Sequence, residues 1–108
     1  MRLTSEFWVS AYIRAAQAAG DFAVLRKRGA TEAGAIFIIV DDMKGNVSLF
    51  GPAPQAGLDD VSDRTFECLL EASDPLTIND RLEKEKRFDP DFWVVEREAH
   101  SGNHGLRV

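Results

Sequence analysis

In the first twenty residues, the polar positions recur with the period of a helix. The polar side chains fall on one narrow stripe, at spacings of three or four residues: Glu6, Ser10, Arg14 and Gln17. Thr4 or Ser5 can cap the start and Gly20 can end the helix, so the pattern predicts a helix from about Ser5 to Ala19. Nearly all of the remaining positions of the helix are apolar. They form an apolar face wider than the one that a helix packed on one sheet usually has.

Three segments with the composition of strands follow the helix: Phe22–Arg28, Ala33–Asp41 and Val47–Phe50. The second contains the run from Ile36 to Val40, which is β-branched or aromatic throughout and typical of a central strand buried on both faces. Residues 42–46 have the composition of a turn. Gly51 and Pro52 end the third strand, because a proline nitrogen cannot donate a hydrogen bond to a sheet.

The segment from Thr65 to Glu71 fits two structures. Phe66, Cys68 and Leu70 alternate as the inward positions of a strand do, which would make Cys68 a small buried apolar residue. Phe66, Leu69 and Leu70 also fit one face of a helix. The alternation favours the strand, and the helix stays open as the alternative.

The last part of the chain predicts a second helix and a final strand. Asp74 can cap a helix that begins at Pro75 and runs to about Arg87. The apolar run at Phe92–Glu96 then predicts a strand.

The predicted order is α-β-β-β-(β)-α-β, which is an α+β fold with a small, mostly antiparallel sheet of four to five strands and two helices. We expect both helices to cover one face of the sheet. A single domain should span residues 1–98. Residues 99–108 contain serine, glycine and asparagine with few apolar side chains, so they predict a flexible C-terminal tail.

Charge and cysteine usage narrow the classes of function. The net charge is −5, made of +3 in residues 1–30, −8 in residues 31–80 and zero in the remainder. An acidic protein repels phosphate, so nucleic acid is not an expected partner, although Arg26, Lys27 and Arg28 form a short basic run. The chain contains one cysteine and no apolar segment long enough to cross a bilayer, and its amino terminus lacks a signal-peptide pattern. These features predict a cytoplasmic protein without membrane contact.

Catalytic and metal-binding motifs are absent from the sequence. Cys68 has no histidine on a predicted helix or strand that could activate it as a nucleophile. His100 and His104 are four residues apart, but Gly102 and Asn103 between them argue against a helix that would bring both to one metal ion. We therefore expect no cofactor and no metal, and we assign no catalytic residue.

A small enzyme is the alternative, with charged residues converging from the ends of several strands: Arg26, Arg28, Asp41, Asp42, Asp89 and Asp91. Acid–base catalysis needs two carboxylates in different environments, so that their pKa values separate. Aspartates at these positions also suit turns and helix caps, which is the simpler interpretation.

Four blocks of sequence are distinctive: Met1–Ala11, Arg28–Phe37, Leu49–Gln55 and Arg87–Glu96. They resemble a family of short alphaproteobacterial proteins known as domain of unknown function 1491. The resemblance extends to about Glu98 and leaves the tail outside it. It implies a bacterial, stand-alone domain, and it carries no activity or site residue over to this chain.

The wide apolar face of the first helix, the uneven charge and the lack of a catalytic motif favour a non-enzymatic, self-associating interaction module. We expect a homodimer through helix 5–19, because a two-fold contact is the commonest way to bury such a face. An unknown protein partner is also expected. In the rival arrangement, the acidic loop at residues 51–63 folds over the helix within one chain.

Overall fold

A computed structural model describes residues 3–54 and 64–108 of the 108-residue chain. Along the sequence the elements are α1 (Ser5–Ala18), β1 (Phe22–Lys27), β2 (Ile36–Asp41), β3 (Val47–Pro52), β4 (Phe66–Ser73), α2 (Pro75–Phe88) and β5 (Trp93–Glu98). The order α-β-β-β-β-α-β confirms the predicted α+β fold. The segment that fitted either a strand or a helix is the strand β4.

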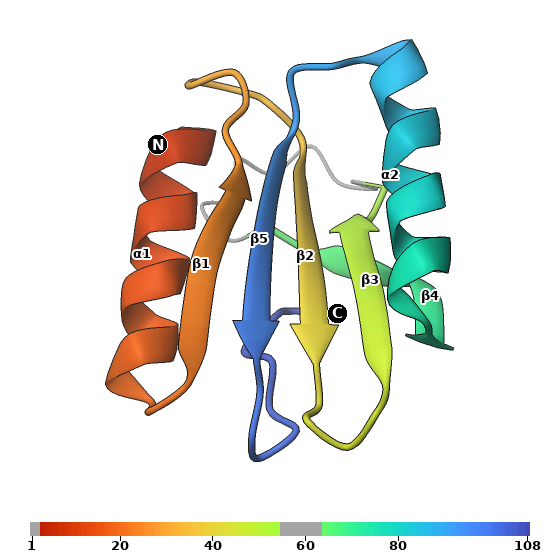
Figure 1. Ribbon diagram of the computed structural model, residues 1–108. Coiled ribbons are helices and arrows are strands. Elements are labelled where there is room, and N and C mark those ends of the chain that lie inside the picture. Colours follow the sequence, from red (N-terminus) through yellow and green to blue (C-terminus); the bar gives the residue numbers. More distant parts are fainter. Residues whose placement is uncertain (1–2, 55–63) are drawn as a thin grey trace.

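The five strands form one mixed sheet in the order β1-β5-β2-β3-β4 (Figure 1). The last strand, β5, enters between β1 and β2, antiparallel to β1 and parallel to β2. The pairs of β2 with β3 and of β3 with β4 are antiparallel. The predicted central strand is confirmed, because all five residues from Ile36 to Val40 are buried.

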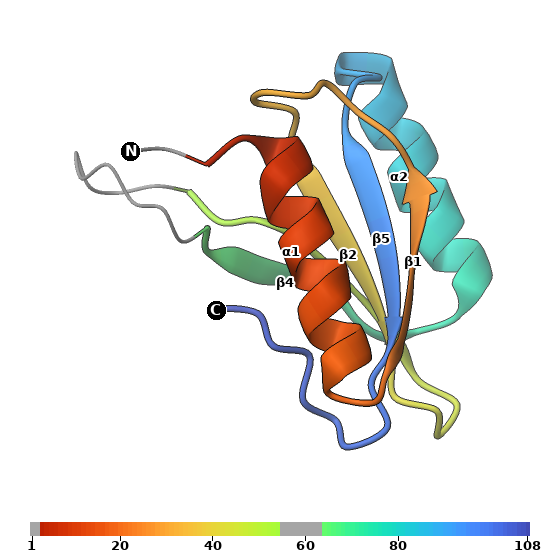
Figure 2. The same cartoon turned by 90° about the vertical axis from the view of Figure 1, so that its left-hand side faces the viewer.

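The two helices cover opposite faces of the sheet, so the expectation that they share one face is wrong (Figure 2). On the α1 side, Val9 and Tyr12 pack in one cluster with Ile36, Ile38 and other sheet residues. On the α2 side, a second cluster joins Ile78 and Leu82 of α2 to Phe37, Ile39 and Leu49. Successive side chains of β2 point to opposite faces, and both sets are apolar, so each face needs its own cover.

Local hydrogen bonds fix the start of each helix as the sequence predicts. Thr4 is the cap of α1, where its side chain accepts from the amide of Phe7 at 3.1 Å. The hydroxyl of Ser5 donates instead to the buried carbonyl of Gly34 at 2.6 Å. Asp74 caps α2 by accepting from the amide of Thr77 at 2.8 Å. Both caps satisfy amide groups that the first turn of a helix leaves free.

Each helix covers only part of its face, because α1 packs mainly on β1 and α2 packs on β3 and β4. The C-terminal segment lies on the same side as α1 (Figure 2). Ala99 is fully buried in the α1-side cluster, Leu106 packs against that cluster, and the carbonyl of Arg107 accepts from the amide of Phe66 at 2.8 Å. The flexible tail stays a prediction. These contacts support the alternative, in which the C-terminal segment is docked on the sheet.

Cys68 is exposed, so its assignment to the core is wrong. It lies in β4, the edge strand farthest from β1, opposite Phe50 and therefore on the α1 side of the sheet. Trp8 of α1 packs on Phe66 at the start of this strand, with ring centroids 5.2 Å apart, but Cys68 itself stays exposed. A register shift next to Phe50 also turns both Leu69 and Leu70 toward the α2 side, which breaks the alternation on which the prediction depended.

Candidate functional site

The sequence predicts six residues for the alternative enzyme site: Arg26, Arg28, Asp41, Asp42, Asp89 and Asp91. The structure divides them between the two ends of the sheet. β2 and β5 run side by side from the Ile36–Trp93 pair to the Asp41–Glu98 pair, about 17 Å at roughly 3.3 Å per residue. The two arginines end β1 and the last two aspartates precede β5, so these four lie at the Trp93 end. Asp41 and Asp42 lie at the other end.

Three of the aspartate carboxylates are used in turns. Asp41 Oδ1 accepts from the amide of Met43 at 2.8 Å, and Asp42 Oδ1 accepts from the amide of Lys44 at 2.7 Å. The hydrogen bond from Lys44 lowers the pKa of Asp42. Asp89 Oδ1 accepts from the amide of Asp91 at 3.0 Å. These are the local roles that aspartate plays in turns, and no pair of them converges on a common point.

The two arginines of the set face opposite sides of the sheet. Arg26 forms an ion pair with Glu96 of β5 and lines a pocket on the α2 side. Arg28 pairs with Glu6 of α1, and its guanidinium lies 5.1 Å from the ring centroid of Trp93 in the α1-side cluster. The basic run around residues 26–28 therefore does not form one continuous cationic face.

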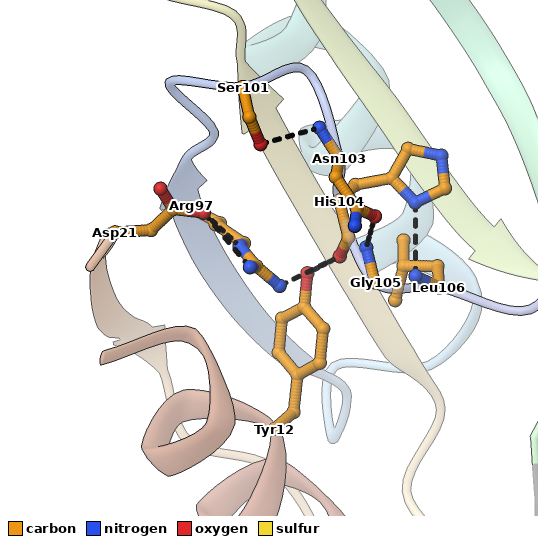
Figure 3. Close-up of polar contacts among 8 residues, drawn as sticks. All are labelled: Tyr12, Asp21, Arg97, Ser101, Asn103, His104, Gly105 and Leu106. Atoms are coloured by element: carbon orange, nitrogen blue, oxygen red, sulfur yellow. Dashed lines mark hydrogen bonds and ion pairs between the residues drawn. The ribbon is translucent and has the colours of Figure 1, made fainter. Parts of the chain in front are cut away.

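A buried polar network that the sequence did not reveal surrounds Arg97 at the end of β5 (Figure 3). Arg97 is only 5% exposed, and its Nε and Nη2 both lie 2.9 Å from Asp21 Oδ2. Arg97 Nη1 donates to the carbonyl of His104 at 3.0 Å, and the Tyr12 hydroxyl donates to the same oxygen at 2.5 Å. We call these four residues the Arg97 network. Burial raises the pKa of Tyr12, and the charge of Arg97 opposes that rise.

The Arg97 network has a structural role, because its donors and acceptors already contact one another. The His104 ring packs on Phe50, with centroids 4.8 Å apart, and its Nδ1 accepts from the amide of Leu106 at 3.0 Å. Burial, and then the charge of Arg97, lower the pKa of His104. In the described part of the chain, every buried side-chain nitrogen or oxygen has a hydrogen-bond partner. One signal was available in the sequence: Trp93, Val95 and Arg97 share one face of their strand.

On the α2 side, β1 and β5 form a part of the sheet over which no described helix lies (Figure 1). Its side chains are Phe22 and Val24 of β1 and their partners Glu98 and Glu96 of β5. Where this strip meets α2, a pocket of about 140 Å³ opens, which we call the α2-side pocket. Its lining combines apolar and charged residues: Ile39, Leu82, Phe92, Val94, Asn79, Arg26, Lys27, Glu83 and Lys86.

Lys27 is held in place at the α2-side pocket by contacts with the backbone and with an aromatic ring. Its Nζ donates to the carbonyl of Pro90 and, at 2.9 Å, to the carbonyl of Phe92. It also lies 4.4 Å from the centroid of the Phe92 ring, a cation–π distance. A register shift between Leu25 and Lys27 turns Lys27 to the same side as Val94, its partner in β5. The sequence offered no signal for this arrangement, because it depends on β5 pairing with β1.

Comparison with protein families gives a match over almost the whole chain. Residues 3–107 match the family described as Protein of unknown function (DUF1491). The chain belongs to the DUF1491 family. This confirms the resemblance that the four sequence blocks predicted, but the expectation that the tail lies outside it is wrong, because the match includes residues 99–107. A comparison with curated proteins gave no match.

Solved structures of DUF1491 and related proteins share the fold. The solution structure of protein Atu0922 from A. tumefaciens is 48% identical, with a TM-score of 0.82, and the match covers 91% of this chain and 86% of that one. The crystal structure of a DUF1491 family protein from Caulobacter crescentus is 32% identical, with a TM-score of 0.81, and the match covers 98% of this chain and 94% of that one. Both relatives are alphaproteobacterial.

The described residues of this DUF1491 protein contain neither a cluster of metal ligands nor a membrane-spanning helix. Within residues 3–54 and 64–108, no group of three or more histidine, cysteine, aspartate or glutamate side chains could hold a metal ion. Neither helix in the described part of the chain is long and apolar enough to cross a membrane.

Proposed function

We propose that this DUF1491 protein is a non-enzymatic interaction protein that self-associates as a homodimer through α1. The observation that supports the proposal is a row of exposed apolar side chains along the helix, the α1 stripe: Phe7, Ala11, Ala15 and Ala18. Phe7 is 59% exposed, and the three alanines continue its line at helical spacing. Exposure of such an apolar surface to water is unfavourable. The alanine side chains are small enough to let a second helix approach closely.

The α1 stripe alone is too small for a stable dimer. A helix of 14 residues is about 21 Å long, so a stripe about 10 Å wide covers roughly 200 Å². Each partner of a stable interface usually buries about 800 Å². The contact must therefore extend onto a neighbouring surface. The edge strand β1 meets this need, because α1 packs on it and its Leu25, which points to the α1 side, is 38% exposed (Figure 2).

Two-fold symmetry makes the proposed contact specific. In an antiparallel pair of α1 helices centred on Ala11, Phe7 of one copy lies beside Ala15 of the second copy, because both are four residues from the centre. The large side chain then fills the space above the small one on both sides of the axis. An edge strand such as β1 would pair with its symmetry mate in the same arrangement.

The alternatives have less support. The enzyme alternative needs Arg26, Arg28, Asp41, Asp42, Asp89 and Asp91 in one place, and they lie at two ends of the sheet. An unknown protein partner at α1 would use the same stripe. The rival cover of α1 by the 51–63 loop involves residues 55–63, which lie outside the described residues. Binding to nucleic acid stays an unfavoured prediction, because the net charge of −5 opposes it.

Size-exclusion chromatography with light scattering tests the homodimer. We expect the wild-type protein at tens of micromolar to have twice the mass of one chain, and Ala15→Glu to restore the monomer with an unchanged circular dichroism spectrum. Gln17→Glu is the matched control, since it adds the same charge at an exposed polar position of the same helix turn. A wild-type monomer, or a dimer that both variants leave intact, would reject the α1 contact.

We also propose a cytoplasmic location. Cys68 is a free, exposed thiol, and such a thiol persists in a reducing compartment. Fractionation of cells with a specific antibody, in which the protein follows cytoplasmic rather than periplasmic markers, is the test.

A further inference from the structure

The floor of the α2-side pocket is apolar and joins three elements. Ile39 of β2, Leu82 of α2 and Val94 of β5 line it together with Phe92. Its volume of about 140 Å³ is close to the roughly 150 Å³ of a protein cavity that holds one benzene ring. A drug-sized ligand, for which sites are about 300 Å³ or larger, could not be enclosed by this pocket. The pocket therefore suits one six-membered ring or a short aliphatic chain.

Most of the charged groups around this floor neutralise one another. Arg26 pairs with Glu96, and Lys86 Nζ lies 3.0 Å from Glu83 Oε2. Lys27 is the exception, because it forms no ion pair with any carboxylate in the described part of the chain. The pocket thus combines an apolar floor with one uncompensated positive charge.

The neighbours of Lys27 hold its ammonium group at the edge of the floor without neutralising it. Two of its three N–H donors are directed to the carbonyls of Pro90 and Phe92, which leaves one donor free. The contact with the Phe92 ring fixes the same position from another side. A partly buried cation without a counter-ion favours an anion, and a carboxylate accepts a charge-assisted hydrogen bond from it.

We propose that the α2-side pocket binds a small organic monocarboxylate, with its carboxylate on Lys27 and its ring or short chain on Leu82 and Val94. One carboxylate matches the single uncompensated charge, and one ring matches the volume. The site lies on the α2 side of the sheet, away from the α1 stripe, so the proposal does not depend on the homodimer.

Titration of ¹⁵N-labelled protein with sodium benzoate, followed by amide chemical shifts, tests the proposal. We expect saturable shifts with a millimolar dissociation constant, concentrated at the amides of Lys27, Leu82, Phe92 and Val94. Benzamide has the same shape without the charge, and we expect it to bind at least about tenfold more weakly, since a hydrogen bond to a charged group is lost. Shifts that do not saturate, or equal affinity for the two probes, would overturn the proposal.

Three variants separate the role of Lys27 from general charge. We expect Lys27→Met, which keeps the apolar stem, to weaken benzoate binding at least about tenfold and benzamide binding little. Lys84→Met is the matched control, because Lys84 is exposed on α2 and outside the pocket lining. Should Lys27→Met fail to fold, Glu83→Gln at the exposed rim serves instead, and we expect it to strengthen benzoate binding about twofold to threefold by freeing Lys86. Unchanged benzoate affinity in a folded Lys27→Met or in Glu83→Gln would count against the site.

Discussion

The hydroxyl of Tyr12 donates a hydrogen bond to the carbonyl of His104, and this 2.5 Å contact joins α1 to a segment 92 residues further along the chain. The same oxygen accepts from Arg97 at 3.0 Å. Two donors from different elements thus converge on one backbone atom of the C-terminal segment. The bond therefore attaches the C-terminal segment to α1 on the α1 side of the sheet.

Tyr12→Phe isolates this hydrogen bond, because it removes only the hydroxyl. We expect the free energy of unfolding to fall by about 1 kcal/mol, the usual net contribution of one intramolecular hydrogen bond. Urea denaturation monitored by circular dichroism measures the change. Ser10→Ala removes an exposed hydroxyl from the same helix and should change the free energy by less than about 0.5 kcal/mol. Equal effects of the two substitutions would contradict the prediction.

Truncation after His100 tests whether the C-terminal segment is docked. The sequence predicts an unchanged melting temperature, whereas the contacts predict a fall. Removal of residues 101–108 exposes Phe50, takes Leu106 from the α1-side cluster and deprives Arg97 of one acceptor. A fully buried leucine contributes about 1.5–3 kcal/mol to the free energy of unfolding. We therefore expect the melting temperature of a domain of this size to fall by roughly ten degrees. Differential scanning calorimetry measures the melting temperature. A fall of less than about one degree would support the flexible tail instead.

The lowered pKa of His104 predicts a loss of stability in mild acid. The folded state favours the neutral imidazole, whose Nδ1 accepts from Leu106, so the folded pKa lies below the unfolded value of 6.5. This contribution is complete above that value and is lost as the pH falls through the folded pKa. We expect the melting temperature of the wild type to fall relative to that of His104→Asn between pH 7.5 and pH 5. Asparagine can accept the same hydrogen bond but does not titrate.

The matched control for this pH series is His100→Asn, at an exposed position nearby. It should retain the wild-type fall in mild acid. The carboxylates of Asp42 and Asp74, whose pKa values are lowered by backbone amides, titrate in all three proteins and cancel in the comparison. Parallel pH profiles for wild type and His104→Asn would contradict the role of His104.

Trp93 belongs to the core, as its position in an apolar strand predicts. It is 1% exposed, and its Nε1 donates to the carbonyl of Ala30 at 2.8 Å. We expect Trp93→Ala to lower the free energy of unfolding by about 3–5 kcal/mol. Trp93→Phe, which loses the hydrogen bond and part of the ring, should cost less. Phe88→Ala is the control, because Phe88 is 88% exposed, and its effect by urea denaturation should be close to zero.

Added metal ions should not stabilise the protein. A specific site would raise the free energy of unfolding by about 2.7 kcal/mol at a hundredfold excess of metal over its dissociation constant. We expect the melting temperature to stay constant in Zn²⁺ or Mg²⁺, measured by differential scanning fluorimetry. A saturable rise that Asp41→Asn or Asp89→Asn abolishes would support the enzyme alternative.

Elements that depend on neighbours a few residues away could be predicted from the sequence. Thr4 and Asp74 cap the helices because each accepts from an amide three residues later. The β-branched run of β2 marks a strand buried on both faces, since no polar side chain interrupts it. The prediction for Cys68 depended on alternation as well, and it failed because the shift of register in β4 is not encoded locally.

The six candidate site residues illustrate the same limit. Arg28 and Asp41 both end predicted strands, but the antiparallel and parallel pairings of β5 put those two strand ends at opposite ends of the sheet. In the sequence, Lys27 stands out only as part of the short basic run at residues 26–28. Its place beside Phe92 arises when β5, which begins 66 residues later at Trp93, enters the sheet next to β1.

The sequence by itself determined the type and order of the elements, the helix caps, the buried central strand and the family. These follow from periodicity and from hydrogen bonds within three or four residues. The tertiary structure decided the insertion of β5 between β1 and β2, the placement of α1 and α2 on opposite faces, the Arg97 network and the α2-side pocket. Each of these features depends on contacts between residues far apart in the chain. Such contacts minimise the exposed apolar area of the whole molecule, and they leave no periodic pattern in any one segment.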